Sequence, residues 1–586
     1  MTDRVPLRSR TVQAVVALAL VGLLARLVLL RARVAHFDEA RVAYWTLHYL
    51  NTGEFHYRYI IHGPFIQHVG RPLFALLGAT DFAARLPVAV VGGLFPLVAL
   101  WFRHRLAAVE VGGLAFFLAV NPLLLYYGRF MRSTLLVAAF CFVAFAAFVR
   151  AYDGFGPQYL YVGAAMLALG FGAKENAAVY VLCWLGAAAL VVDAKLLHAD
   201  DAGVDRLSRW RDAAVARLRT DGAFDPMAVR WTGHAVGAAL VFAVVAVFMY
   251  APRGGEWVGL YDALTNPLLL PEMLSTTVDQ VATGYGYWFG GTGETKLSTV
   301  VNQLGVSAKA VGGYAAPLVL LSVGGFLAER YGRDSPRQFV LGCAYWGFVS
   351  VPGYALATDI LNAWVLTNAL VPLAVPAAVG LARLVDIGRE SLVQEDGVSV
   401  GVVALLLILV VGAVAGGAAT GVYANTTSPD NALVQYAQPS QEMRAAVDDI
   451  EGVAADTEGT DVYVYGGGNE DFVDGDGNAT REPACITWFR TLPLGWYLSA
   501  SEATVECGNA PEDIPSDLPP VVVVPGDCAL ERTVDCRERP TAMEPPEGVA
   551  DRVDGYERHA FLHRTTGGNW FDGMIVYVDE DRQSQS

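Results

Sequence analysis

Residues 11–30, TVQAVVALALVGLLARLVLL, decide which class of protein this chain belongs to. An α-helix rises about 1.5 Å per residue, so a run of this length spans the roughly 30 Å hydrocarbon core of a bilayer. The run is followed by His36-Phe37-Asp38-Glu39 rather than by a small-residue cleavage site, which argues against a removed signal peptide. The sequence therefore predicts a first membrane helix over residues 11–30.

The rest of residues 1–421 repeats this pattern. The chain has 586 residues, of which 54% are hydrophobic and only 17% charged, and its mean hydropathy is +0.38. An ordinary soluble protein would carry about 25% charged residues. Further apolar runs lie near residues 86–102, 108–126, 133–149, 159–173, 177–192, 234–250, 311–328, 338–357, 364–382 and 399–421. We expect about eleven transmembrane helices, with a long first outer loop at 31–85 and another outer loop at 251–310.

Residues 422–586 have a different composition. They hold 31 Asp and Glu against 10 Arg and no Lys, whereas the whole chain has a net charge of −17. Such a balance excludes a nucleic-acid binder, which needs a basic face. The chain has only four lysines, and an acidic, lysine-poor surface resembles proteins of salt-loving archaea. Strand-like runs such as DVYVYGGG and PPVVVVPG predict a separate α/β or α+β domain over 422–586.

The basic loops and the cysteines indicate on which side of the membrane each part of the chain lies. Lys and Arg are more frequent in the loops that lie inside when the N-terminus is cytoplasmic, although Arg31 and Arg33 just beyond the first helix oppose this. An odd number of helices then places residues 422–586 outside the cell, at the plasma membrane. Four cysteines lie in that part, an even number suited to two disulfides in an oxidising compartment. They are Cys485, Cys507, Cys528 and Cys536, and their pairing stays open.

The first outer loop carries the most chemistry. Asp38 and Glu39 follow the first membrane helix directly, and five of the ten histidines lie between His36 and His68. A carboxylate pair at membrane depth is costly unless it has partners or a function. The alternative is an aromatic belt at the interface with solvated charges, since residues 40–50 also carry Tyr and Trp.

Several motifs follow one another in a recognisable order over residues 12–385. They are His36-Phe37-Asp38-Glu39-Ala40, His62-Gly63-Pro64, Asp81 with Arg85-Leu86-Pro87, Tyr127-Gly128-Arg129-Phe130-Met131-Arg132, Gly170-Phe171-Gly172-Ala173-Lys174-Glu175 and Asn362-Ala363-Trp364. This order resembles the GT-C superfamily of membrane glycosyltransferases. The nearest groups are the dolichyl-phosphate-mannose protein mannosyltransferases and the bacterial lipid-A aminoarabinose transferases. The chain is most similar to an archaeal flippase-activity-associated membrane family of this superfamily.

The resemblance implies a reaction and a set of residues. A sugar would pass from a dolichyl-phosphate carrier to a lipid-linked glycan or glycoprotein on the outer face, in protein glycosylation and with inversion. Asp38 would act as general base and Glu39 would orient the acceptor or a neighbouring basic residue. The donor phosphate would meet cations at the outer helix ends. These residues are Lys174, Arg129, Arg132 and His62; for Lys174, snorkelling to the interface is the alternative, and for His62, a role in holding the loop.

One departure from the resemblance bears on catalysis. Relatives often carry an acid just after the arginine of the second outer loop, where this chain has Ser133. No metal site is predicted, and a divalent cation is left open. A second hypothesis is therefore a non-catalytic flippase-associated factor that binds or translocates dolichyl-phosphate sugars. A third, a secondary transporter, lacks the expected internal repeats.

Overall fold

The computed structural model describes residues 9–59, 62–197, 208, 212, 219–220, 223–224, 226–290, 297–356, 362–456, 459–474, 480–526, 540–564 and 572–579. They divide into two compact units. The first comprises Met1–Val28, Glu54–Ile66 and Val88–Val422, and the second Leu29–Gly53, Gln67–Pro87 and Tyr423–Ser586. We predicted that all of 31–85 belongs to the membrane part. Most of that loop instead packs with residues 423–586, for the reasons given by its side-chain contacts below.

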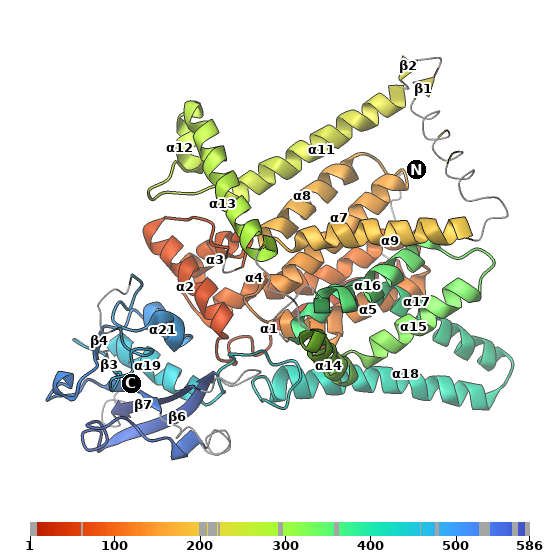
Figure 1. Ribbon diagram of the computed structural model, residues 1–586. Helices are drawn as coiled ribbons and strands as arrows, with labels where there is room; N and C mark the ends of the chain where they lie inside the picture. The colour runs from red at the N-terminus through yellow and green to blue at the C-terminus, as the bar shows by residue number, and fades with distance from the viewer. Residues whose placement is uncertain are drawn as a thin grey trace. The chain divides into compact units, whose positions relative to one another are not determined.

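The first unit is helical (Figure 1). Its helices are α1 (Arg10–Leu27), α5 (Ala108–Val120), α6 (Pro122–Tyr127), α7 (Ser133–Tyr152), α8 (Gln158–Ala173), α9 (Ala177–Leu197), α11 (Pro226–Tyr250), α12 (Leu260–Thr265), α13 (Leu270–Gly290), α14 (Leu297–Tyr314), α15 (Ala316–Tyr331), α16 (Gln338–Leu356), α17 (Thr367–Val393) and α18 (Gly397–Gly417), with a small hairpin of β1 (Arg219–Thr220) and β2 (Ala223–Phe224). Helices α3 (Pro64–Leu77) and α4 (Asp81–Leu94) run from one unit into the other. The predicted outer loop 251–310 contains α12, α13 and the start of α14 rather than an extended loop.

Six helical segments in the described residues are long and apolar enough to cross a membrane, or seven if α14 and α15, bent by 96°, form one span. Three shorter apolar helices accompany them: Ala108–Val120, Gln158–Ala173 and Ala177–Asp193. The expected number of about eleven is not confirmed. The predicted run 108–126, for example, is divided at Asn121-Pro122 into α5 and α6.

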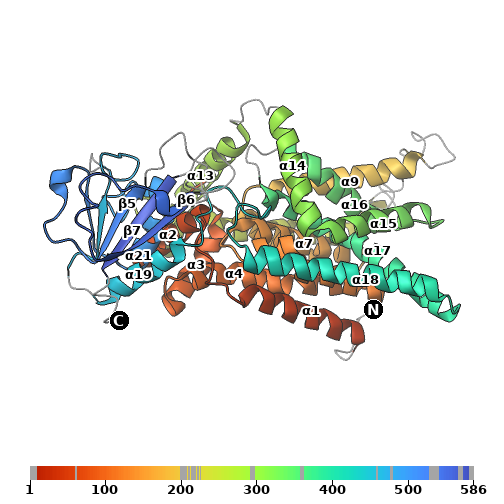
Figure 2. The same ribbon diagram turned by 90° about the horizontal axis from the view of Figure 1, so that it is seen from below.

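Helix α17 lies at the centre of the first unit. It contacts α5, α7, α15 and α16, and Figure 2 shows it beside α15 and α16. In its most apolar window, which includes the turn before it, 94% of the residues are buried. Small residues let α15 approach it closely: a Cβ on Gly325 would lie 1.9 Å from the carbonyl oxygen of Pro376, and one on Gly380 would lie 2.2 Å from that of Leu321. Close backbone contact of this kind replaces the hydrophobic effect as the force between membrane helices.

Arg26 shows how the first unit accommodates a charge within a predicted membrane helix. Its side chain is fully buried, and Nη1 donates to the carbonyls of Gly22, at 2.9 Å, and Ala119, at 2.8 Å. The guanidinium therefore finds acceptors on α1 and α5 instead of lipid.

The second unit contains a five-stranded sheet with the strand order β4-β3-β5-β7-β6. Strands β3 (Val462–Tyr465), β4 (Val505–Gly508) and β5 (Val521–Gly526) are parallel, while β6 (Tyr556–Arg564) and β7 (Asp572–Asp579) are antiparallel to their neighbours. Its helices are α2 (Phe37–Thr52), α19 (Met443–Asp456), α20 (Trp488–Thr491) and α21 (Leu494–Ala500). Val521–Val524 are fully buried, as the VVVV run of a central strand predicts. The small mixed sheet domain is confirmed.

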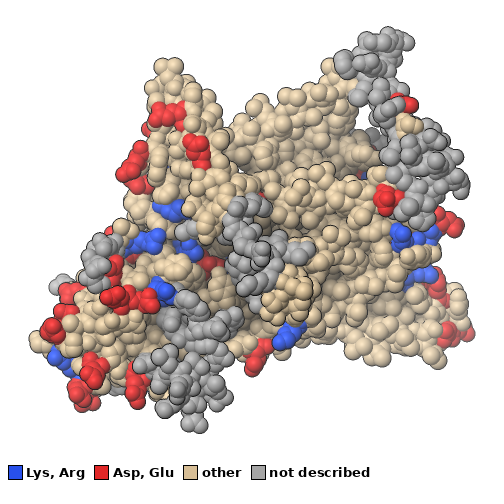
Figure 3. Space-filling view, in the orientation of Figure 1, with Lys and Arg blue, Asp and Glu red and all other residues tan. Residues whose placement is uncertain are grey.

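The surface charge of the second unit and one of its disulfides agree with the predictions from the sequence. Acidic side chains are frequent on the surface around the sheet, whereas much of the helical surface carries no charge (Figure 3). Cys485 and Cys507 form a disulfide. The other two predicted partners, Cys528 and Cys536, lie outside the described residues.

Candidate functional site

His36 begins α2 and fixes the position of Asp38. The His36 Nδ1 accepts a hydrogen bond from the Asp38 backbone N–H at 3.0 Å, and its Nε2 donates to the carbonyl of Tyr436 at 2.8 Å. With one nitrogen accepting and the other donating, the ring is neutral. Asp38 thus lies in the first turn of α2, where the helix dipole favours a carboxylate. Its side chain is 19% exposed.

Glu39 is enclosed by two arginines. One oxygen accepts from Arg85 Nε at 2.9 Å, and the other accepts from Arg33 Nη2 at 2.9 Å, Arg85 Nη2 at 3.1 Å and the His36 N–H at 2.9 Å. All three charged side chains are almost fully buried. Burial alone would raise the pKa of Glu39, but Arg33 and Arg85 outweigh it and hold that pKa well below its ordinary value. Both oxygens of Glu39 are occupied, and its side chain is less exposed than that of Asp38.

Residues from the C-terminal part complete this network within the second unit. Tyr497 accepts a hydrogen bond from the Ala35 N–H at 2.7 Å and donates to Asp81 at 2.8 Å. Gln438 accepts from Arg33 at 3.1 Å, and Arg444 forms an ion pair with Asp81 at 3.3 Å. The Asp38-Glu39 turn is thus held by segments that follow it by some 400 residues. We did not predict Arg33, Tyr497 or Gln438; the outer position of Arg33, against the positive-inside rule, was the one available signal.

His62-Gly63-Pro64 brings two predicted cation sites together in the first unit. His62 Nδ1 lies 3.0 Å from the hydroxyl of Ser133, the residue after Arg132, and the Gly63 N–H donates to the Ala173 carbonyl at 2.9 Å, beside Lys174. A Cβ on Gly63 would lie 2.4 Å from the Gly172 carbonyl oxygen, so only glycine fits. The motif therefore joins the N-terminal end of α7 to the C-terminal end of α8.

The three predicted cations differ in their surroundings. Arg129 Nη1 donates to the carbonyls of Ala25, Arg26 and Val28 at 2.5–3.0 Å, so this arginine caps the C-terminal end of α1. Arg132 is buried with its guanidinium 4.9 Å from the centre of the Trp364 ring. Lys174 follows the last residue of α8 in extended conformation and is partly exposed. Arg129 is thus engaged by backbone carbonyls, and an anion-binding role for Arg132 and Lys174 stays a prediction.

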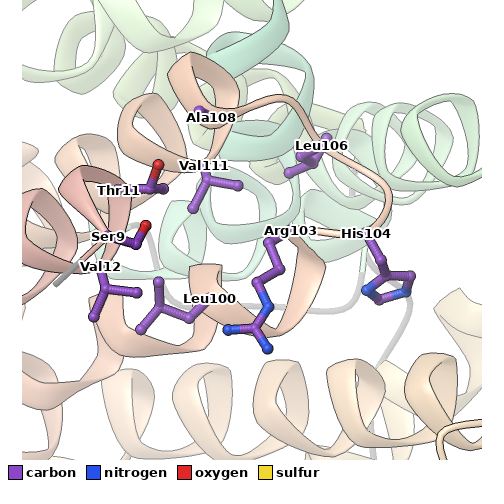
Figure 4. A pocket seen from close by; sticks show the side chains of 9 residues that line it. All are labelled: Ser9, Thr11, Val12, Leu100, Arg103, His104, Leu106, Ala108 and Val111. Atoms are coloured by element: carbon purple, nitrogen blue, oxygen red, sulfur yellow. The ribbon is translucent and has the colours of Figure 1, made fainter. Parts of the chain in front are cut away.

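A pocket of about 290 Å³ lies at the other end of α1 from Arg129 (Figure 4). Its lining is Ser9, Thr11, Val12, Leu100, Arg103, His104, Leu106, Ala108 and Val111. None of the predicted site residues lines it. The described residues hold no group of three His, Cys, Asp or Glu side chains arranged for a metal ion.

Comparison with known proteins identifies solved structures with the same fold and a family that matches the C-terminal part. Residues 443–579 match the family described as the Agl23 flippase-associated protein C-terminal domain. ArnT from Cupriavidus metallidurans bound to undecaprenyl phosphate is similar over 96% of this chain and 97% of its own, with 14% identity and a TM-score of 0.51. The apo form of that ArnT gives a TM-score of 0.50 at 14% identity, with 97% and 98% covered.

The other comparisons add little. An oligosaccharyltransferase from Archaeoglobus fulgidus has a TM-score of 0.45 at 13% identity, covering 87% of this chain and 68% of its own. No curated protein matches the sequence significantly. The predicted fold class, a polytopic helical protein of GT-C type with a C-terminal sheet domain, is confirmed. The chain therefore shares the fold of ArnT over nearly its whole length, and its residues 443–579 match the family described as the Agl23 flippase-associated protein C-terminal domain.

Proposed function

We propose that the chain is a membrane glycosyltransferase that transfers a sugar from a dolichyl-phosphate donor to a lipid-linked glycan or glycoprotein. The reaction takes place on the outer face of an archaeal plasma membrane, with the N-terminus cytoplasmic and residues 422–586 outside. The observation that carries the proposal is the different condition of two adjacent acids. Both oxygens of Glu39 are engaged by Arg33 and Arg85, whereas the Asp38 backbone is held by His36 and the Asp38 side chain is 19% exposed.

In this mechanism Asp38 is the general base. It accepts the proton of an acceptor hydroxyl as that oxygen forms a bond to C1 of the sugar. The bond between C1 and the phosphate oxygen breaks, and dolichyl phosphate leaves with the electron pair, so the anomeric centre inverts. Lys174 and Arg132 stabilise the phosphate charge, and His62 holds the loop between them. The likeness to an ArnT structure bound to undecaprenyl phosphate supports a polyprenyl-phosphate ligand.

Glu39 acts as a positioning residue rather than as a second base. Its occupied oxygens cannot take up an acceptor proton without losing an arginine. Through Arg85, which also donates to the carbonyls of Leu30 and Arg33 at 2.9 and 2.8 Å, Glu39 fixes the chain just before Asp38. The acceptor hydroxyl therefore meets a single, pre-oriented carboxylate.

A second candidate is a flippase-associated factor without transferase activity. It is favoured by the match of residues 443–579 and by Ser133, whose hydroxyl is paired with His62 where relatives carry an acid. Ser133→Asp discriminates the two. It creates or strongly raises transfer if catalysis was lost, and it does not raise transfer if Asp38 already suffices.

The test in cells uses a strain that lacks the gene. The strain is complemented with the wild type, with Asp38→Asn or with the exposed-residue control Asp517→Asn, and its surface glycans are analysed by mass spectrometry. The proposal expects one terminal sugar to be missing with Asp38→Asn and present with the other two. A full glycan with Asp38→Asn rejects Asp38 as the base.

A further inference from the structure

Glu175 is a buried acid that the mechanism above does not use. It lies in the turn between α8 and α9, next to Lys174, and its side chain is 1% exposed. Neither of its carboxylate oxygens has a hydrogen-bond partner among the residues that the structure describes. A buried carboxyl group without partners is strongly unfavourable, so its presence calls for an explanation outside stability. Such groups are functional-site candidates, especially in membrane proteins.

The surroundings of Glu175 are tyrosines from three segments of the first unit. Tyr285 on α13 lies with its hydroxyl 3.4 Å from the Glu175 backbone carbonyl, to which it donates. Tyr250 on α11 donates to the Phe171 carbonyl at 2.6 Å, and the ring of Tyr57 packs edge-on against Tyr250 with centroids 4.9 Å apart. Tyr250 and Tyr285 lie close enough to Glu175 to interact with it electrostatically, and the adjacent Lys174 is the nearest cation in sequence.

Two further polar atoms near the turn between α8 and α9 are, like the Glu175 carboxylate, buried without a hydrogen-bond partner in the described residues. The Asn176 Oδ1 and the Tyr57 hydroxyl are buried and have no hydrogen-bond partner in the described part of the chain. Burial raises the pKa of Glu175 to about 7, so near neutral pH its carboxyl group can donate as well as accept. The junction therefore offers both hydrogen-bond acceptors and hydrogen-bond donors to a ligand.

The hydrogen-bonding groups of Glu175, Asn176 and Tyr57 favour one class of ligand over others. A phosphate is bound by cations and N–H donors, which Glu175 does not supply, and a divalent cation needs several more oxygen ligands than one carboxyl group supplies. An uncharged polyol fits, because two neighbouring hydroxyls can pair with the two carboxyl oxygens while the sugar ring packs on aromatic faces. We propose that Glu175, together with Asn176 and Tyr57, binds the hydroxyl groups of the sugar that the phosphate carrier brings. The inference rests on the proposed function, in which the neighbouring Lys174 binds that phosphate.

The test measures lipid binding to the full-length protein in nanodiscs by native mass spectrometry. The probes are dolichyl phosphate alone and dolichyl phosphate carrying mannose, glucose or N-acetylglucosamine. We expect the wild type to bind at least one sugar-bearing probe more tightly than the bare lipid. Glu175→Leu should weaken that binding about tenfold, the loss expected for hydrogen bonds to an ionisable group, and leave the bare lipid within about twofold. Glu175→Gln should restore part of the sugar preference.

Stability separates this role from a structural one. Because Glu175→Leu removes an unsatisfied polar group, its melting temperature should equal or exceed that of the wild type. Glu272→Leu, at an exposed position on α13, is the matched control and should change neither quantity. A wild type without sugar preference, an unchanged preference in Glu175→Leu, or a marked loss of stability in that variant overturns the inference.

Lys174→Ala distinguishes failure of the inference from failure of the proposed function. It should weaken the bare and the sugar-bearing lipids equally, because it removes a phosphate contact. If Lys174→Ala changes neither while Glu175→Leu abolishes the sugar preference, the phosphate role of Lys174 is wrong and the sugar site stands.

Discussion

Arg85 donates two parallel hydrogen bonds to Glu39, from Nε to Oε1 at 2.9 Å and from Nη2 to Oε2 at 3.1 Å. This bidentate pair lies at the base of the turn that presents Asp38, and Arg33 adds a third charge-assisted bond. Two neighbouring carboxylates that look equivalent in the sequence are therefore different: Glu39 is buried between two arginines, whereas the Asp38 side chain is 19% exposed.

Glu39→Gln should destabilise the protein strongly. Removing the carboxylate leaves Arg33 and Arg85 buried without their counter-charge, which typically costs about 3–5 kcal/mol. Asp38→Asn should cost less than about 1 kcal/mol, since the His36 bond goes to backbone. Thermal unfolding of the two variants in detergent provides the comparison. Equal melting temperatures would contradict the assignment of Glu39 to the scaffold.

Acid should remove the contribution of Glu39. A carboxylate with a lowered pKa in the folded state stabilises the protein above its ordinary pKa of 4.5, and this stabilisation is lost as the pH falls further. The difference in melting temperature between wild type and Glu39→Gln should therefore be constant from pH 8 to pH 6 and shrink below pH 4.5. A difference that grows toward acid pH would show that the ion pair is not the cause.

Tyr497→Phe tests whether the C-terminal part supports the turn. The change removes one hydroxyl that serves both the Ala35 N–H and Asp81, so that the buried Ala35 N–H loses this acceptor while Asp81 keeps its ion pair with Arg444. The expected cost is about 1–3 kcal/mol of stability with a reduced rate of sugar transfer. Tyr577→Phe, on β7 of the same unit, is the control and should leave transfer unchanged. A Tyr497→Phe variant with full stability and transfer would refute the support.

Gly63→Ala should separate the His62 loop from α8. The new methyl group would meet the Gly172 carbonyl at 2.4 Å and force the loop outward, breaking its hydrogen bond to Ala173. We expect a loss of transfer larger than the loss of stability, because the loop connects the ends that carry Arg132 and Lys174. Gly112→Ala, at a position with open space around it, is the matched control.

The sequence predicted whatever depends on local pattern. Apolar runs gave the helices α1 and α17, and the VVVV run gave the central strand β5, because burial over consecutive residues leaves a direct trace in composition. The number of spans was not settled, since a break or a 96° bend can divide one apolar stretch. The joining of Leu29–Gly53 with residues 423–586 could not be predicted, because it depends on contacts such as Ala35 with Tyr497, which no periodicity encodes.

In the candidate site, too, some features could be predicted from local sequence and others depend on contacts between distant segments. His62, Asp38 and Lys174 were singled out from motif order, and their roles stay predictions. That Glu39 is fully engaged, and that Arg129 caps α1, follows only from three-dimensional contacts. The unpartnered state of Glu175 likewise required the structure.

The central claim is that Asp38 removes a proton during sugar transfer. Its most direct test is the rate of transfer from a labelled dolichyl-phosphate sugar in membranes that contain equal amounts of folded wild type or Asp38→Asn. General-base catalysis contributes about 10²–10⁴-fold, so we predict a fall of at least about 100-fold at unchanged melting temperature. A rate within about threefold of the wild type would contradict the claim.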